Sequence, residues 1–345
     1  MTGSTLLDVA KRAQVSKSTV SLVINGSDRV RPQTAARVRQ AIAELNYIPN
    51  RTARTLRSGR THLLGIIVSD ITNPYFAELV RGVTAAARTD RYDAFVLDTD
   101  YDPELLLSHI ESLREYRPDG LLLLTTERSR RAVARLQELE LPAVLLNWGW
   151  SGRRISEVAV DYLPAIAQLA GHLRDLGHRR LAFITGPKQY HSAGAREQAF
   201  RQALAAHDGR FAPPIFWEGD FRLLPETGQR IADALHRLPP EQRPTALVAS
   251  SDLIAFSALR ALQAAGWQVP AGISLAGIDD IALSAFVTPS LTTLRLPRRA
   301  MGKAAYTLLK QMIDNPSLTA PVQVVEPRLI LRESVGPAPP ERTAL

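Results

Sequence analysis

From Thr61 onward the chain alternates short apolar runs with longer helical patterns, and this alternation constrains the fold more than any other feature. The first apolar run is Leu63–Val68, and further runs occupy residues 94–97, 120–124, 143–146 and 158–160. Helical periodicity follows at 76–88, 103–116, 128–139 and 163–176. Apolar strands separated by helices predict parallel sheets that are covered by helices on both faces.

The alternation restarts after residue 180 and predicts a second sheet. Its strands are expected at 181–184, 215–217, 246–249 and 273–277, and its helices at 195–207, 227–237 and 252–265. Two successive runs predict two doubly wound lobes, with a ligand between them at the carboxyl ends of the strands. We expect a two-lobed domain at 61–336, with a first lobe of about 61–161 and 292–322, a second of about 162–291 and 323–336, and a disordered tail at 337–345.

Residues 1–48 carry a different pattern, in which two short helical segments flank a tight turn at Gln14-Val15. The apolar positions of the first segment are Leu7, Val9, Ala10 and Ala13. Ser16 can cap the second segment, because its hydroxyl can accept a free amide of the first turn. The pattern is typical of a helix-turn-helix, which places the start of its second helix in the DNA major groove. Two ordinary helices of a small bundle are the alternative interpretation.

The charge distribution favours the DNA interpretation. Between Met1 and Arg60 there are eleven lysines and arginines but only three aspartates and glutamates, so this segment carries the whole formal charge of +8. The rest of the chain has equal numbers of both signs and is neutral. A basic module on a neutral body favours phosphate binding with release of counterions.

A third helix is expected from about Pro32 to Asn46, followed by a linker at 49–60. In this linker Leu56 is an apolar residue among arginines and threonines. A short helix that forms on DNA could insert Leu56 between base pairs in the minor groove. A flexible basic linker explains the same residues equally well.

Composition excludes several other classes of protein. The chain has no cysteine, which rules out disulfides, thiolate nucleophiles and cysteine-bound metals. No apolar run is long enough to span a membrane, and the N-terminus lacks an apolar signal core. His172, His178 and His191 lack metal-ligand spacing, and the first two are interpreted as surface or capping residues. We expect a cytoplasmic protein with no cofactor.

Residues 5–60 resemble the DNA-binding module of the lactose/galactose repressor family of bacterial transcription regulators. The matching motifs lie at Asp8–Ala10, Val15–Ser21, Asn25-Gly26, Tyr47–Asn50 and Ala53 to Leu56. The resemblance continues to about Glu333, through motifs at 65–76, 117–120, 176–182, 186–187, 196–200, 251–252, 277–280 and 289–293.

The resemblance implies that Lys17, Ser18 and Leu22 read the operator. Further contacts, most of them to phosphate or backbone, are implied at Thr5, Ser16, Thr19, Asn25, Arg31, Thr34, Tyr47, Asn50 and Ala53, and minor-groove insertion is implied at Leu56. Many relatives have arginine at the position of Leu22, which can grip guanine with two hydrogen bonds. Leucine offers only apolar contact, for instance to a thymine methyl group. Arg31 replaces a small capping residue and can add a phosphate contact.

The resemblance also implies an effector site between lobes like those of periplasmic binding proteins. Its residues are expected to be Tyr75, Phe76, Asn147, Trp148, Tyr190, Ser192, Arg196, Phe221, Ser251 and Asp279. In relatives Arg196 is the main polar anchor, and Asp279 can accept hydrogen bonds from hydroxyl groups. The aromatic members suit stacking on a sugar ring or a base, although ordinary packing explains each ring alone equally well.

These observations favour a ligand-responsive repressor that acts as a homodimer on a near-palindromic operator. A sugar or sugar derivative is the first choice of effector, and a nucleobase or nucleoside is the second. An enzyme or a sugar-binding protein of the same lobe architecture, with an accessory DNA-binding module, is the alternative. Catalysis has little support, because the sequence contains neither a phosphate-binding loop nor a nucleophile elbow.

Overall fold

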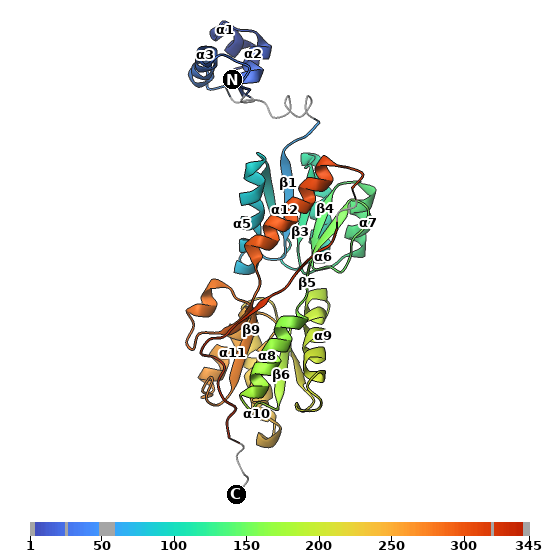
Figure 1. The fold of residues 1–345 in the computed structure, drawn as a ribbon, viewed down its shortest axis with the longest axis vertical. Coiled ribbons are helices and arrows are strands. Elements are labelled where there is room, and N and C mark those ends of the chain that lie inside the picture. The colour runs from blue at the N-terminus through green and yellow to red at the C-terminus, as the bar shows by residue number, and fades with distance from the viewer. Residues whose placement is uncertain (1–3, 25–26, 48–58, 319–320, 341–345) are drawn as a thin grey trace. The chain divides into compact units, whose positions relative to one another are not determined.

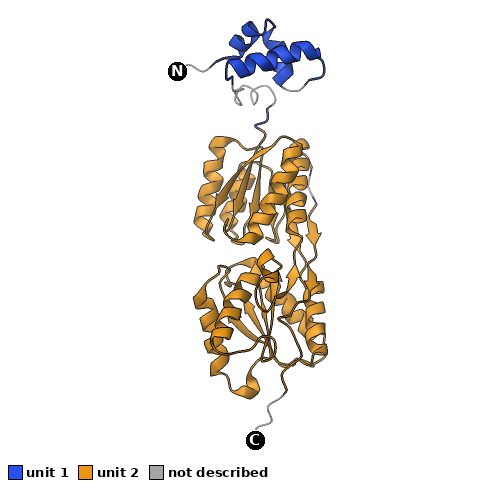
Figure 2. Cartoon of the chain, turned by 90° about the vertical axis from the view of Figure 1, so that its left-hand side faces the viewer, with its two compact units in different colours: residues 1–61 blue, residues 62–345 orange. Residues whose placement is uncertain are grey.

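The computed structural model describes residues 4–24, 27–47, 59–318 and 321–340. The chain forms two compact units, residues 1–61 and 62–345 (Figure 2). The expected DNA contacts at Asn25, Asn50, Ala53 and Leu56 lie outside the described residues, as does most of the linker. Residues 341–345 of the expected tail lie outside them too.

The N-terminal unit is a bundle of three helices, α1 (Leu6–Arg12), α2 (Lys17–Ile24) and α3 (Pro32–Glu44). Buried side chains of all three helices, joined by that of Tyr47, meet in one core: Val9, Ala10, Ala13, Val20, Val23, Ala35, Val38, Ala41 and Tyr47. Leu7, which was expected among the apolar positions of α1, is instead 41% exposed. Gln14 adopts a left-handed conformation (φ 52°) in the turn between α1 and α2. The expected helix-turn-helix is confirmed.

Local hydrogen bonds explain where these helices begin. The Thr5 hydroxyl accepts from the Asp8 amide (3.3 Å), and the Asp8 carboxylate accepts from the Thr5 amide (2.9 Å). This reciprocal pair is a capping box. Ser16 Oγ accepts from the Thr19 amide (3.1 Å) at the start of α2. Arg31 precedes α3 without a side-chain capping bond, as expected for a residue without a capping hydroxyl.

The second unit contains two lobes (Figure 1). The sheet of the first lobe has strand order β11-β5-β4-β3-β1-β2, and its paired strands are all parallel. The strands are β1 (Leu63–Val68), β2 (Asp93–Asp98), β3 (Gly120–Leu124), β4 (Ala143–Leu146), β5 (Ile155–Val160) and β11 (Gln323–Val325). Helices α5 (Pro74–Thr89) and α12 (Arg298–Asp314) pack on one face, and α6 (Pro103–Tyr116) and α7 (Arg130–Glu138) on the other.

The sheet of the second lobe has strand order β12-β10-β9-β8-β6-β7, with only β10 and β12 antiparallel. Its strands are β6 (Leu181–Thr185), β7 (Ile215–Glu218), β8 (Ala246–Ala249), β9 (Ser274–Asp279), β10 (Thr292–Arg295) and β12 (Arg328–Ile330). Its helices are α8 (Leu163–Asp175), α9 (His191–Ala205), α10 (Pro225–Arg237) and α11 (Asp252–Ala264). In the part of the chain that the structure describes, no helix is long and apolar enough to cross a membrane.

The chain passes between the lobes after β5, after β10 and between β11 and β12. Two of these exchange points differ from those expected. Residues 292–295 pair with β9 and belong to the second sheet, whereas 323–325 pair with β5 and belong to the first. These edge strands are so short that their apolar pattern does not reveal which sheet they join. Helix α12 lies between the two exchange points and packs on the first lobe.

The end of the chain is fixed to the second lobe as far as the description reaches. The Ala338 amide donates to the Leu176 carbonyl (2.8 Å). The first residues of the segment that was expected to be disordered are therefore bound to the second lobe. His178, which was expected at the surface or as a cap, is completely buried. Its Nε2 donates to the Gly336 carbonyl (2.9 Å), and its Nδ1 lies 2.8 Å from Thr245 Oγ1. His178 therefore anchors the C-terminal segment.

Candidate functional site

The candidate effector residues stand where strands end, at the carboxyl edges of the two parallel sheets. Phe221 follows β7, Ser251 follows β8 and Asp279 ends β9, while Arg196 lies in the second turn of α9 after β6. Tyr75 stands in the first turn of α5, which follows β1. Parallel α/β sheets bind ligands at this edge, because side chains from several strands converge there.

Arg196 is the centre of this arrangement, and only 5% of its surface is exposed. Its Nη1 donates to the Ser250 carbonyl (2.8 Å), and its Nη2 lies 3.5 Å from Asp279 Oδ1. The guanidinium carbon also lies 5.0 Å from the ring centre of Tyr162 and 5.7 Å from that of Phe221. A carboxylate and two aromatic faces thus surround a buried cation. Its buried Nε has no hydrogen-bond partner among the described residues.

The electrostatics connect this pair with the first lobe. Burial raises the pKa of Asp279 to about 7, although the neighbouring Arg196 favours its charged form. Burial also raises the pKa of Tyr75, helped by Tyr162 and Asp279 and opposed by Arg196 and Arg298. The charges of the Arg196–Asp279 pair in the second lobe therefore act on Tyr75 of α5 in the first. A carboxyl group that titrates near neutral pH can donate or accept a hydrogen bond there.

Aromatic rings form one side of the site. Tyr190 and Phe221 stack with their ring centres 6.0 Å apart, and the Tyr190 hydroxyl donates to the Tyr101 carbonyl of the first lobe (3.2 Å). The Phe221 ring lies directly against Gly186, where an added Cβ would be 2.2 Å from Cζ of the ring. Glycine is therefore required at 186 for Phe221 to reach the site.

Three further predicted residues are Phe76, Ser192 and Asn147. Phe76 is buried and packs edge-on against Tyr75, with ring centres 5.0 Å apart. Ser192 lies one turn before Arg196 on α9, and its buried Oγ has no partner within the described chain. Asn147 Oδ1 accepts from the Val160 amide (3.2 Å), whereas its buried Nδ2 has no partner in the described ranges. A polar ligand could satisfy these atoms.

Two predicted residues are occupied by structural contacts instead. Trp148 packs among the side chains between the first sheet and α6 and α7, and its indole N–H donates to the Thr125 carbonyl (3.1 Å). Its ring thus points to the far side of the sheet from α5. Ser251 caps α11, where its Oγ accepts from the Ile254 amide (3.2 Å). The structure does not bring Trp148 together with Arg196.

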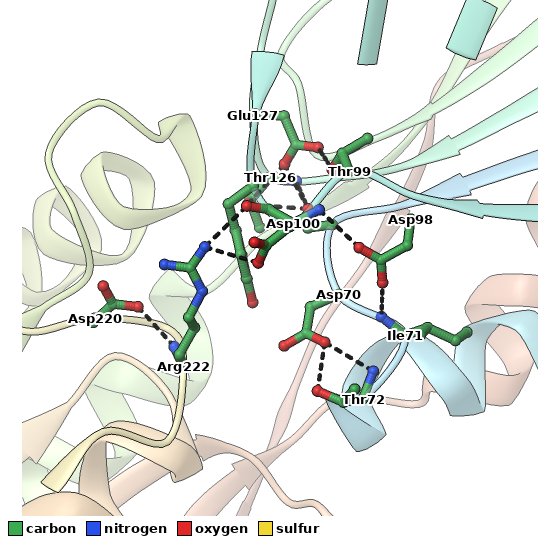
Figure 3. Close-up of polar contacts among 12 residues, drawn as sticks. Asp70, Ile71, Thr72, Asp98, Thr99, Asp100, Thr126, Glu127, Asp220 and Arg222 are labelled. Carbon is green, nitrogen blue, oxygen red and sulfur yellow. Dashed lines mark hydrogen bonds and ion pairs between the residues drawn. The ribbon is translucent and has the colours of Figure 1, made fainter. Parts of the chain in front are cut away.

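A polar network joins the two lobes (Figure 3). Arg222 of the second lobe donates to the carboxylate of Asp100 in the first (2.8 Å) and to its backbone carbonyl (2.9 Å). Asp220 holds the turn before it by accepting from the Arg222 amide (2.9 Å). Nearby, Glu127 is fully buried and accepts from the hydroxyls of Ser69 (2.6 Å) and Thr99. Burial raises the pKa of Glu127, and these hydroxyls oppose the rise.

Sequence reasoning missed Tyr162, Arg222 and Arg298. Tyr162 follows β5, so the rule that polar residues at strand ends converge could have found it. Arg222 and Arg298 carried no comparable signal, because Arg222 lies in a loop and Arg298 begins α12, and the direction of each side chain depends on the packing of the two lobes.

The second helix of the N-terminal unit presents polar residues outward. Lys17 and Ser18 are exposed, and Leu22 is exposed despite being apolar. Thr5 and Arg31 are exposed as well, whereas Thr19 and Thr34 are half-buried. Tyr47, a predicted contact residue, is 9% exposed and belongs to the core of the unit.

Comparisons with known proteins identify the class that this fold and site define. Residues 5–50 match the family model described as bacterial regulatory proteins, lacI family, and residues 170–335 match a periplasmic binding protein-like domain. The fold and site are those of a DNA-binding regulator with a two-lobed effector domain. The chain belongs to the LacI family of bacterial transcription regulators, which are not enzymes.

Individual relatives cover almost the whole chain. The HTH-type transcriptional repressor PurR of Aliivibrio fischeri (strain MJ11) is 34% identical over 334 residues, which cover 96% of this chain and 98% of the relative. The ribose operon repressor of Haemophilus influenzae is 34% identical with the same coverage. A crystal structure of the lac repressor dimer bound to operator and the anti-inducer ONPF has a TM-score of 0.81 at 26% identity, with 97% of this chain and 100% of that chain covered.

Proposed function

We propose that this regulator is a repressor switched by a sugar or sugar derivative that binds between the lobes. The observation that carries the proposal is the buried Arg196–Asp279 pair, with Arg196 Nε left unpaired among the described residues. A sugar hydroxyl both donates and accepts, so adjacent hydroxyls fit a guanidinium beside a carboxylate. The Phe221 ring offers an apolar surface to the sugar ring.

Relatives support this class of effector. Besides the ribose operon repressor, a transcriptional regulator CelR–cellobiose complex has a TM-score of 0.71 at 30% identity, with 96% of this chain and 99% of that chain covered. A nucleobase or nucleoside is the second candidate. The stacked pair of Tyr190 and Phe221 favours it, because a flat base could lie against either ring.

The proposed contact with DNA is made by the start of α2. Lys17 and Ser18 would meet base edges, and Leu22 would make apolar contact. The remaining residues implied by the resemblance would hold phosphate and backbone, and Leu56 would enter the minor groove. The exposure of Lys17, Ser18 and Leu22 in the folded unit supports this assignment.

The proposed active form is a homodimer on a near-palindromic operator, since two-fold symmetry matches two half-sites. Exposed apolar side chains support an interface, including Phe95, Tyr116 and Phe286. The sequence from Pro337 to Leu345 contains three prolines and no heptad of leucines, a pattern that does not favour a coiled coil. Sedimentation equilibrium should give a dimer, and a tetramer that survives deletion of 337–345 would require another interface.

Switching requires an effector that binds one arrangement of the lobes better than the other. Arg196 and Asp279 would hold the effector from the second lobe, and Tyr75 and Phe76 would contact it from the first. A ligand that touches both lobes favours the arrangement in which all four residues reach it.

A thermal-shift screen of sugars, sugar phosphates and nucleobases tests the effector class, because a ligand of the folded state raises the melting temperature. Arg196→Ala should abolish the shift and the effector's influence on operator binding, while operator binding without effector stays within about twofold. An unchanged effector midpoint in Arg196→Ala would place the ligand elsewhere.

A further inference from the structure

The corner that follows β9 is held firmly from its own lobe. Asp279 and Asp280 both have positive φ values, 124° and 53°, which non-glycine residues adopt only when their surroundings enforce them. The carboxylate of Asp280 pairs with Arg295 (2.5 Å) and Arg332 (2.6 Å), both from the second lobe. Asp279 is therefore followed directly by an ion-pair network in which Asp280 is buried and Arg295 is exposed to solvent.

Arg298 reaches the same corner from the first lobe. It is the first residue of α12, and its two terminal nitrogens donate to the carbonyls of Asp279 and Asp280, the second at 2.8 Å. Its buried Nε has no partner in the ranges described. Burial raises the pKa of Asp279, and Arg298 opposes that rise together with Arg196. The guanidinium of Arg298 thus acts on the Asp279 side chain as well as on the Asp279 backbone.

Helix α12 is packed backbone to backbone on α5 (Figure 1). A Cβ added at Gly82 of α5 would lie 2.2 Å from the Arg299 carbonyl oxygen, and one at Gly302 of α12 would lie 2.1 Å from the Leu79 carbonyl oxygen. Such close packing makes the two helices move as one body. Because Arg298 of α12 binds the corner, α5 is connected to the corner through its packing on α12.

We propose that Arg298 is a positioning residue that couples Asp279 to the α5–α12 pair, so that ligand contact in the second lobe is transmitted to the first. The proposal rests on the effector site proposed at Arg196 and Asp279. Two donors of one rigid guanidinium on adjacent carbonyls allow a single placement of α12 against the corner. Any rotation of the lobes that displaces either must break these hydrogen bonds, because they weaken steeply with distance and angle.

The first test is hydrogen exchange of the full-length protein without ligand, read on peptides covering residues 276–284. Arg298→Gln should raise exchange there at least tenfold. Arg299→Gln is the matched control, because Arg299 is the next residue of α12 and pairs with Glu78 of α5 (2.6 Å) instead of the corner. Arg298→Lys should restore part of the protection, since an ammonium group can bind one carbonyl but lacks the fork. Equal exchange in wild type and Arg298→Gln would overturn the proposal.

The second test measures whether ligand binding in the second lobe affects hydrogen exchange in the first, with D-ribose, cellobiose and adenine as separate probes. In wild type a bound probe should slow exchange in 276–284 and in residues 80–89 of α5, which follow the proposed ligand contacts at Tyr75 and Phe76. In Arg298→Gln it should slow exchange in 276–284 but not in 80–89. Undiminished protection of 80–89 in the variant would also overturn the proposal. If no probe protects wild type, the proposed effector class fails, and the ligand-free exchange still decides the role of Arg298. If Arg298→Gln does not fold, the same comparisons are made with Arg298→Lys.

Discussion

Asp100 and Arg222 join the two lobes of the effector domain, with Arg222 Nη2 2.8 Å from Asp100 Oδ1. The guanidinium also lies over the Tyr101 ring, 5.2 Å from its centre. Tyr101 in turn accepts a hydrogen bond from Tyr190, whose ring stacks on Phe221. An ion pair at the surface is thereby continuous with the aromatic side of the proposed effector site.

Reversing one charge of this pair should open the lobes. Arg222→Glu places two carboxylates together, so the distance between the lobes should increase, and Asp100→Arg combined with Arg222→Asp should restore it. Because the chain has no cysteine, spin labels on Ser112→Cys and Gln229→Cys report this distance cleanly by pulsed EPR. Both partners are substantially exposed, so the expected change in unfolding free energy is below about 1 kcal/mol. Identical distance distributions in all variants would argue that the pair does not hold the lobes together.

Asp279→Asn should change how stability depends on pH. The pKa of Asp279 is raised from 3.8 to about 7 in the folded state, so between about pH 4 and 7 the folded chain keeps a proton that the unfolded chain has lost. The contribution of Asp279 to stability therefore falls as pH rises through this window, by about 1.4 kcal/mol for each step of one in pH. In urea unfolding, the unfolding free energy of Asp279→Asn relative to that of wild type should increase from pH 4 to 7. A constant difference across this range would contradict the raised pKa.

Gly82→Ala should destabilise the effector domain, because its methyl group meets the Arg299 carbonyl of α12. The expected loss is roughly 1–3 kcal/mol, and it opposes the gain in helix propensity. Gly171→Ala in α8 is the control, since nothing lies within 4 Å of the added Cβ, and it should stabilise by roughly 0.5–1 kcal/mol. Chemical denaturation measures both, and equal effects would mean that α5 and α12 are not in close contact.

Lys17→Ala should weaken binding to the operator by about 1–3 kcal/mol and relax one base position. The operator can be obtained by selection from random duplexes with the wild-type protein. Arg39→Ala, which removes an exposed cation of α3, should weaken operator and random DNA alike. The same uniform loss in Lys17→Ala would make Lys17 a phosphate contact.

The sequence by itself determined the helices and strands whose buried residues follow a regular pattern along the chain. Leu63–Val68, Pro103–Tyr116 and Gly120–Leu124 have in the structure the ends that were expected, because continuous apolar runs and helical stripes report burial from neighbouring positions alone. The capping role of the Ser16 hydroxyl could also be predicted, since its partner Thr19 lies in the first turn of α2. The convergence of Arg196 and Asp279 followed from the rule for strand ends, with the family resemblance naming the residues.

Only the tertiary structure decided which way several side chains and short strands turn. Trp148 follows β4 just as expected of a site residue, yet its ring packs on the α6–α7 side of the sheet. Residues 292–295 and 323–325 joined sheets other than those expected, and Arg222 and Arg298 reached across to the opposite lobe. Each outcome depends on partners that belong to other elements of the chain, and local periodicity contains no information about such partners. The physical reason is that these contacts form only after both sheets have assembled and brought distant segments within hydrogen-bonding range.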